Sequence, residues 1–506
     1  MNWTMALTMR ILYIDCDSLR SDHLGCYGYH RNTSPNIDEL AEDGLRMTNY
    51  YASDTPCLPS RTALFTSRLG IHTGVINHGG LQADPRRSGH ERGFKYPRKF
   101  QTFTRALREA GLHTVTLSPF PHRHDAIQVL EGFAEVHDPG DSRAPAHHHY
   151  EYAEEWLEDN AVDDDWFLHV NFWDPHTEYN TPEEFGNPFE DEPAPEWLTQ
   201  ETIDEHYATY GPHSAFNPES ASLDWSGSWD LERMPEEIET REQFEQWVDG
   251  YDVGIRYMDR YIGKIFELLR EAGVFEETLV ILSADHGENL GELNVYGDHH
   301  TADEYTSNVP LIMRGPQVES GVDEAFHYQV DLAPTLVELV DGDVREGWDG
   351  RSFSKTVTDG ESAGRDYLVL SQGAWACQRS VRWDDWLLMR TYHDGCKSLL
   401  EDVMLFDLES DPHETTNLAD ERPDVVEEGL AKLQQWHDER MLEASRGENG
   451  GNPDTPDGVT DPMWEVLREG GPLHAKQSIG PYADYLRTVG REEQAAEIEA
   501  KYDLEG

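Results

Sequence analysis

Lysine, cysteine and long apolar runs are all scarce in this sequence. Eight of the 40 basic residues are lysine, and 99 acidic residues outnumber the basic ones. A chain with this charge repels the phosphate backbone of nucleic acids, so we expect no nucleic-acid partner. No stretch approaches the roughly 20 apolar residues of a membrane span, and the N-terminus lacks a secretory signal pattern. The five cysteines have no framework spacing, which favours a reducing, cytoplasmic location over a disulfide scaffold.

The acidic excess gives a formal net charge of −59. Self-repulsion of this size destabilises a compact state in dilute buffer, whereas at molar ionic strength the Debye length falls to roughly 3 Å. The acids are dispersed along the chain, which favours an adaptation to salt over a docking surface for a basic partner. Together with the arginine bias, the composition resembles that of proteins from salt-accumulating archaea. Because 37% of the residues are hydrophobic, the chain should fold.

Short apolar runs alternate with helical patterns over the first two thirds of the 506 residues. This rhythm predicts an α/β fold, with a large, mostly parallel sheet sandwiched by helices. Apolar residues at helical spacing over 255–269 predict a helix that ends near Gly273. From about residue 370 the pattern changes, so we expect a catalytic domain over 1–370 and a smaller α+β subdomain with a helical tail over 371–506. The clearest predicted strands lie at 11–14, 114–117, 166–172 and 278–282, and in the second part at 380–382 and 386–391.

Two of the predicted strands are followed by acids. Asp15 and Asp17 follow the strand at 11–14, and Asp285 with His286 follows the strand at 278–282. Ligands gather at the carboxyl ends of strands in an open α/β sheet, so these side chains are candidate metal ligands. Asp15 lies two residues before Asp17 and thus on the same side of an extended strand. Two alternatives stay open here: an acid caps the next helix, or Asp285 and His286 form a structural hydrogen-bonded pair.

The segment over 55–70 carries the most specific motif. It contains Cys57-Leu58-Pro59-Ser60-Arg61 and continues through Thr66-Ser67-Arg68 to Gly70. A lone cysteine is most often a small buried hydrophobe. Here several positions match in order, and the segment resembles the signature of the sulfatase family, Cys-any-Pro-Ser-Arg followed by a helix.

The resemblance implies a mechanism and a cofactor. Members of the family oxidise this cysteine to formylglycine, so a formylglycine-generating enzyme would act on Cys57. One hydroxyl of the hydrated aldehyde attacks sulfur, and the other later expels sulfate, while Arg61 holds the hydroxyl oxygens by charge-assisted bonds. A divalent cation lowers the pKa of the attacking hydroxyl; family precedent favours calcium, with magnesium or manganese as alternatives. The implied ligands of this cation are Asp15, Asp17, Asp285, His286 and the oxygen of residue 57.

Other segments resemble the family in the same order along the chain. The stretches at 22–28 and 33–38 match the family's sequence after its first strand. The stretch at 171–176 resembles the strand whose Pro-His pair places a histidine on the sulfate, so His176 is a candidate catalytic residue. The stretch at 405–418 resembles a C-terminal block of the family.

The sequence also departs from the family pattern. Many sulfatases carry Asp-Asp where this chain has Asp17-Ser18, and Asp-Asn where it has Asp285-His286. Two active-site lysines of typical arylsulfatases are replaced by the segments 118–124 and 297–301. Unless these segments are solvated loops, arginine or histidine must supply the positive charge, and a histidine must be held protonated by the sulfate or by Asp298. The candidates are Arg123, His124, His299 and His300.

Three functions are compatible with the sequence. The leading hypothesis is hydrolysis of a small-molecule or glycan sulfate ester, or of a sulfamate, to release inorganic sulfate. The Asp285-His286 pair also occurs in phosphonate monoester hydrolases of the same alkaline-phosphatase-like superfamily, so a phosphonate monoester or phosphodiester is the alternative substrate. A hypothesis of another class is a calcium-binding scaffold without catalytic activity. Loss of Cys57 or Arg61 would indicate such a scaffold, and both residues are present. The oligomeric state stays open.

Overall fold

The computed structural model describes residues 9–85, 102–218, 233–446 and 460–503. Its centre is an eight-stranded sheet formed by β1 (Arg10–Asp17), β2 (Leu45–Met47), β5 (His113–Leu117), β6 (Glu135–His137), β7 (Trp166–Pro175), β8 (Thr278–Ala284), β11 (Leu311–Arg314) and β12 (Gly321–Asp323). The strand order is β12-β2-β11-β8-β1-β7-β5-β6. Within this sheet, β11 alone runs antiparallel to its neighbours. The prediction of a large, mostly parallel sheet is confirmed.

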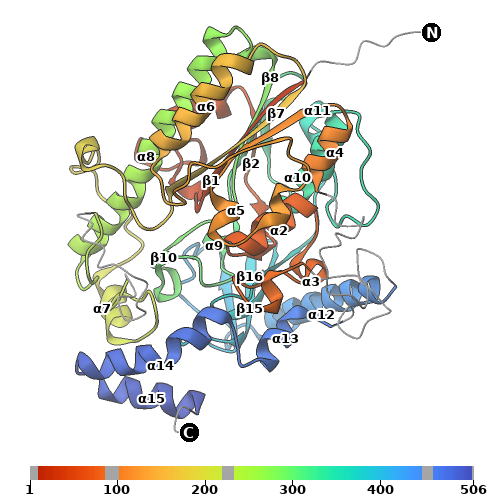
Figure 1. Ribbon diagram of the computed structural model, residues 1–506. Helices are drawn as coiled ribbons and strands as arrows, with labels where there is room; N and C mark the ends of the chain where they lie inside the picture. Colours follow the sequence, from red (N-terminus) through yellow and green to blue (C-terminus); the bar gives the residue numbers. More distant parts are fainter. Residues whose placement is uncertain (1–8, 86–101, 219–232, 447–459, 504–506) are drawn as a thin grey trace.

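Helices cover both faces of this sheet (Figure 1). On one face, α6 (Ala146–Asn160) and α8 (Arg241–Glu271) pack against β7, and α1 (Pro35–Glu42) lies beside α8. On the other face, α2 (Cys57–Thr66), α4 (Phe103–Glu109) and α10 (Leu332–Leu339) contact one another. Shorter helices connect these elements: α3 (Gly70–Thr73), α5 (Phe120–Arg123), α7 (Gln200–Ala208), α9 (Glu304–Ser307) and α11 (Ser354–Asp359).

The helix α8 is longer than the apolar spacing over 255–269 predicts. Thr240 begins it with a capping box, in which its side chain accepts from the Gln243 backbone and Gln243 bonds back. Buried Phe244, Trp247 and Tyr251 then extend the apolar stripe towards the N-terminus. The helix therefore begins well before the predicted range, and its end at Glu271 agrees with the predicted end near Gly273.

A second, five-stranded sheet has the order β17-β16-β15-β14-β4. Four strands come from the C-terminal part, namely β14 (Leu368–Gln372), β15 (Cys377–Trp383), β16 (Trp386–His393) and β17 (Val403–Asp407), while β4 (Asp54–Thr55) comes from the segment just before Cys57. The chain division at residue 370 stays a prediction, and β14 spans it. The helix α12 (Pro423–Ser445) packs on this sheet, and α13 (Pro462–Arg468), α14 (Leu473–Thr488) and α15 (Glu492–Tyr502) form the helical tail.

The strand β1 lies at the centre of the main hydrophobic core. Its residues Ile11, Leu12, Tyr13 and Ile14 are fully buried, because a parallel neighbour flanks the strand on each side and helices cover both faces. Two pairs of short strands lie outside the large sheets: β3 (Tyr50–Tyr51) with β13 (His327–Tyr328), and β9 (Asn289–Leu290) with β10 (Tyr296–Asp298). Among the described residues, no helix has the length and apolar character that a membrane crossing requires.

Candidate active site and metal centre

The register of the central strands brings the predicted site residues to one edge of the sheet. Asp17 at the end of β1 lies opposite Pro175 of β7, and Cys16 lies opposite Ala284 of β8. His176 and Asp285 follow directly after these two partners. Three segments that are far apart in the sequence therefore converge, because the carboxyl ends of neighbouring parallel strands share an edge.

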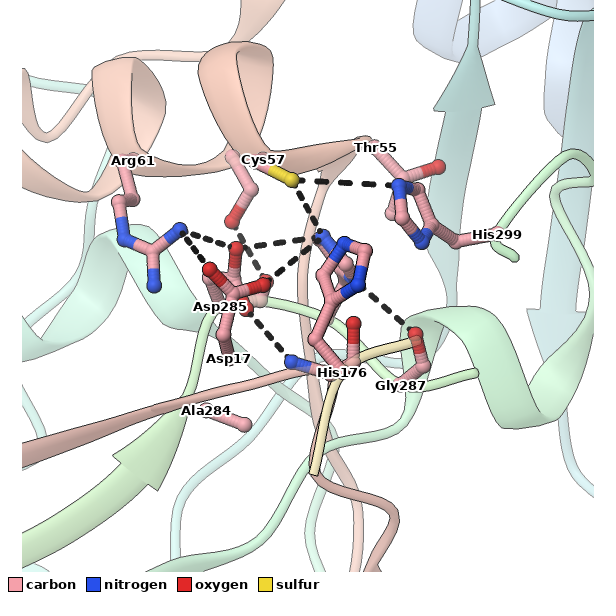
Figure 2. A network of polar contacts seen from close by, with 12 residues as sticks. Asp17, Thr55, Cys57, Arg61, His176, Ala284, Asp285, Gly287 and His299 are labelled. Carbon is pink, nitrogen blue, oxygen red and sulfur yellow. Dashed lines mark hydrogen bonds and ion pairs between the residues drawn. The ribbon is translucent and has the colours of Figure 1, made fainter. Parts of the chain in front are cut away.

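Cys57 reaches the same edge from α2. It is the first residue of the helix, where the partial positive charge of the N-terminus favours an anionic ligand. Arg61 follows four residues later, about one turn along, and lies on the same face of the helix. Figure 2 shows the thiol between Arg61 and Asp285 on one side and the ring of His299 on the other.

Asp17, Cys57, Asp285 and His286 each present one ligand atom, and these atoms lie within 4.8 Å of one another. The Nε2 atom of His286 is 3.1 Å from Cys57 Sγ and 3.2 Å from Asp285 Oδ2. Its Nδ1 donates to the Gly287 carbonyl at 2.8 Å, which leaves the lone pair of Nε2 facing the group. Asp17 Oδ1 is buried and bonds to no other described residue. Two carboxylates, an imidazole and residue 57 fit a divalent cation.

The structure gives Asp15 a different place from the one predicted. Asp15 is not part of that ligand group; its Oδ2 accepts from Arg61 Nε at 2.9 Å and lies 3.3 Å from His169 Nε2. The Nη1 group of buried Arg61 also donates to Asp285 Oδ2 at 2.5 Å and to Asp17 Oδ2 at 3.3 Å. The physical reason is depth in the strand: Asp15 lies further from the edge and reaches the guanidinium instead of the cation ligands.

Burial and neighbouring charges set the protonation of these groups. Burial opposes ionisation of Asp17, but Arg123, whose Nη2 lies 2.7 Å from Asp17 Oδ2, and Arg61 hold its pKa well below the usual value. Burial outweighs Arg61 at Asp285 and raises its pKa to about 6. Burial also raises the pKa of the Cys57 thiol, and the charge of Asp17 adds to this. An unmodified Cys57 is therefore a protonated thiol at neutral pH.

A cavity of about 400 Å³ opens over Cys57. His176 lines it, as do three of the four predicted replacements for the missing lysines, Arg123, His124 and His299. The Nε2 atom of His299 is 3.9 Å from Cys57 Sγ, and the ring of His176 stacks on Trp173 with centroids 4.1 Å apart. The fourth candidate, His300, does not line the cavity. Its ring stacks on Trp375 with centroids 3.8 Å apart, and its Nε2 atom lies 3.0 Å from Asp298 Oδ2.

Burial lowers the pKa values of the cavity's histidines and so favours their neutral forms near neutral pH. Burial lowers the pKa of His176 to about 4, although the charge of Asp17 opposes the change. Burial also holds the pKa values of His124 and His299 well below the usual range. Asp298 lies 3.2 Å from His299 Nε2, but its charge does not outweigh burial. A histidine was expected to be held protonated by the sulfate or by Asp298, and the charge of Asp298 alone is not sufficient for His299.

Several residues of the cavity have no motif that marks them. His78, His213, Trp375, Leu473 and His474 contribute to its walls. They come from loops and from the first residues of α14, so tertiary packing alone brings them to Cys57. The only signal in the sequence is its content of 24 histidines.

Three comparisons place this geometry among known proteins. A family model described as Sulfatase matches residues 10–342. Choline-sulfatase of Rhizobium meliloti (strain 1021) is 26% identical over 438 residues, which cover 76% of this chain and 78% of that protein. A protein solved with its substrate D-glucosamine-2-N,6-O-disulfate superposes with a TM-score of 0.67 at 18% identity, over 86% of this chain and 98% of that one. Phosphonate monoester hydrolase of Agrobacterium radiobacter gives a TM-score of 0.65 at 19% identity, over 85% and 96%.

The two structural likenesses support the fold, and the family match covers more than half of the chain. The matched range includes the ends of β1, β7 and β8 and the start of α2, which carry the site. The chain therefore belongs to the sulfatase family of sulfuric ester hydrolases.

Proposed function

We propose that this protein hydrolyses a sulfate monoester to an alcohol and inorganic sulfate, with residue 57 acting as a formylglycine nucleophile. The observation that carries the proposal is the place of Cys57 Sγ within the group of Asp17, Asp285 and His286. A thiol whose pKa is raised by burial is a poor nucleophile. The hydrate of an aldehyde at the same position supplies two hydroxyl groups, one to attack sulfur and one to expel sulfate.

Asp17, Asp285 and His286 would hold the divalent cation. When bound, the cation supplies Lewis acidity, which lowers the pKa of the attacking hydroxyl and neutralises sulfate oxygens. We propose calcium from the family precedent, while the imidazole of His286 makes manganese the first rival.

The arginines of the site bind and orient oxygen atoms. Arg61 is fixed by Asp15, Asp17 and Asp285, yet its Nη2 group donates to no other described residue. This group is a donor for the hydroxyl oxygens of residue 57 or for the sulfate. Arg123 lines the cavity and keeps its Nε group without a partner in the described parts of the chain. It supplies a second donor to the sulfate.

His176 and His299 are placed to donate a proton to the leaving oxygen. Both line the cavity, and their ring centroids are 5.3 Å apart. Because burial keeps both neutral, the negative charge of the sulfate ester must raise their pKa values on binding. A positioned proton donor is worth ~10²–10⁴ in rate for a poor leaving group.

Steady-state kinetics on paired esters tests the proposed reaction. The protein is co-expressed with a formylglycine-generating enzyme, and the mass of the peptide with residue 57 reports conversion of the thiol to the aldehyde. We expect the highest kcat/KM on a sulfate monoester and a complete loss with Cys57→Ala. A silent scaffold would cleave nothing although the aldehyde has formed, and that result would overturn the proposal.

Phosphonate monoester or phosphodiester hydrolysis is the second candidate. His286 in the ligand group is compatible with it, because the Asp-His pair resembles that of those hydrolases as well as that of some sulfatases. A kcat/KM that is higher on phenylphosphonate esters or diesters than on matched sulfates would select this candidate.

A further inference from the structure

His213, Asp298 and His300 form a second cluster in the wall of the cavity, which His213 and Asp298 line. Asp298 ends β10, His300 follows two residues later, and His213 comes from the segment after α7. The three residues share no member with the group of Asp17, Cys57, Asp285 and His286. Each offers one ligand atom, and these atoms lie within 4.8 Å of one another.

The spacing in this cluster is that of ligands around one ion. The Asp298 Oδ2 atom is 3.0 Å from His300 Nε2 and 3.5 Å from His213 Nε2. Ligand atoms that lie ~2.0–2.1 Å from a tetrahedral zinc ion are about 3.3–3.4 Å apart, and the two distances bracket this value. The corresponding distance at the first site, between His286 Nε2 and Asp285 Oδ2, is 3.2 Å.

The ring of His300 points to a missing partner. His300 is fully buried, and its Nδ1 atom has no hydrogen-bond partner among the described residues. Its Nε2 atom faces the Asp298 carboxylate at 3.0 Å, a pair that an ion between the two atoms would replace. A buried polar group without a partner is destabilising, so such groups are uncommon unless a ligand satisfies them. Stacking on Trp375 holds the ring in this orientation.

We propose that His213, Asp298 and His300 bind a second divalent cation of the zinc class. Two imidazoles and one carboxylate are ligands that zinc prefers, and a solvent molecule would complete a tetrahedron. His213 adopts a left-handed backbone with φ of 56°, an uncommon conformation that the fold keeps at this position. The site does not rest on the proposed sulfate hydrolysis, because its occupant can be measured without any substrate.

The second cation would position a residue of the active site. Asp298 Oδ1 lies 3.2 Å from His299 Nε2 and accepts the backbone N–H of His299 at 2.8 Å. Its other oxygen, Oδ2, faces His213 and His300. An ion on Oδ2 thus fixes the carboxylate, and the carboxylate fixes the ring of His299 beside Cys57.

The rival explanation is that Lys397 alone balances the charge of Asp298. Lys397 is buried, and its charge adds to the effect of burial in lowering the pKa of His300. Its Nζ donates to the Pro212 carbonyl at 2.5 Å. If this lysine is sufficient, the cluster binds no metal.

Zinc titration by calorimetry decides between the two. The chelator-treated full chain carries Cys57→Ser and Asp285→Ala, which remove the thiol and weaken the first site. We expect one zinc ion per chain, and at least ~100-fold weaker binding after addition of His300→Gln. The matched control is His149→Gln, because His149 is equally buried, bonds to the Ala144 carbonyl and belongs to no ligand group of the described chain. This control should leave zinc affinity unchanged.

Cobalt(II) provides a second readout in case His300→Gln does not fold. A four-coordinate cobalt spectrum should appear in the background variant and disappear with His213→Gln or Asp298→Asn. The proposal is overturned if the background binds no zinc, or if zinc affinity is unchanged in every folded variant of the three ligands.

Discussion

Replacing Arg61 by methionine should make the fold depend on a divalent cation. Arg61 contacts Asp15, Asp17 and Asp285 at 2.9, 3.3 and 2.5 Å, and all four side chains are buried. Methionine fills much of the same space but leaves these carboxylates without their shared cation. Removing one partner of a buried ion pair costs about 3–5 kcal/mol. This is a large part of the roughly 5–15 kcal/mol that stabilises a typical protein.

A bound cation should restore much of this loss in Arg61→Met. It would contact Asp285, which the substitution leaves without a guanidinium, and Asp17, which keeps only Arg123 at 2.7 Å. An ion at 100 times its dissociation constant stabilises the folded state by about 2.7 kcal/mol. The affinity for the ion should also rise, since Asp285 no longer shares its charge with a guanidinium and Asp17 shares its charge with Arg123 alone.

Urea unfolding in molar potassium chloride measures both effects, with a chelator or with excess calcium or manganese. The matched control is Arg379→Met, because Arg379 forms an equally buried bidentate pair with Asp461 at 2.6 and 2.9 Å. The control should lose a similar free energy of unfolding, and the ion should stabilise it no more than the unaltered protein. If the cation stabilises both variants equally, the role given to Arg61 is refuted.

Four further outcomes are expected. The melting temperature should fall as potassium chloride is lowered from molar to low millimolar, because −59 charges lose their screening; a temperature independent of salt would contradict the adaptation to salt. Calorimetry with calcium should show one strong site that Asp285→Ala abolishes, and unchanged binding would rule out this ligand. His176→Ala should slow alkyl sulfate cleavage ~10²–10⁴-fold and nitrophenyl sulfate cleavage far less; equal losses would mean that His176 binds sulfate without protonating the alcohol. Burial lowers the pKa of His149 to about 4, below its unfolded value near 6.5, so protonation of the unfolded chain costs stability as pH falls from 6.5 to 4. In urea unfolding, His149→Gln should reduce by about 3 kcal/mol the free energy of unfolding that is lost between pH 6.5 and 4. An unchanged pH dependence would contradict the lowered pKa of His149.

The central strands and the metal-binding edge could be predicted because their signals are local. Apolar runs predict β1, β7 and β8, and the residues at the end of each strand can be read directly from the sequence. Parallel pairing then requires that Asp17, His176 and Asp285 meet. No tertiary detail was needed for this step.

The walls of the cavity could not be predicted, because they depend on contacts between distant segments. The strand β4 has two residues and no pattern of its own, yet it pairs with β14 and joins the second sheet to the segment before Cys57. His474, the second residue of α14, bonds through Nε2 to His78 Nδ1 at 2.9 Å, almost four hundred residues away. Asp15 was predicted as a ligand because the geometry of an extended strand gives the side on which its side chain lies. This geometry does not give the distance of the side chain from the edge of the sheet.

The charges around Cys57 limit the esters that the site can hold. Asp15, Asp17 and Asp285 carry three negative charges when ionised, and Arg61 and Arg123 carry two positive ones, while the neighbouring histidines are neutral. A divalent cation brings the buried group to a net charge of about +1. A sulfate monoester carries one negative charge and neutralises it, as does a phosphodiester or a phosphonate monoester. A phosphate monoester dianion would leave a buried net negative charge, which costs several kcal/mol. With neutral histidines the proposed site would therefore favour singly charged esters, whereas the proton that His176 or His299 takes up in the proposed reaction adds one positive charge and weakens this preference.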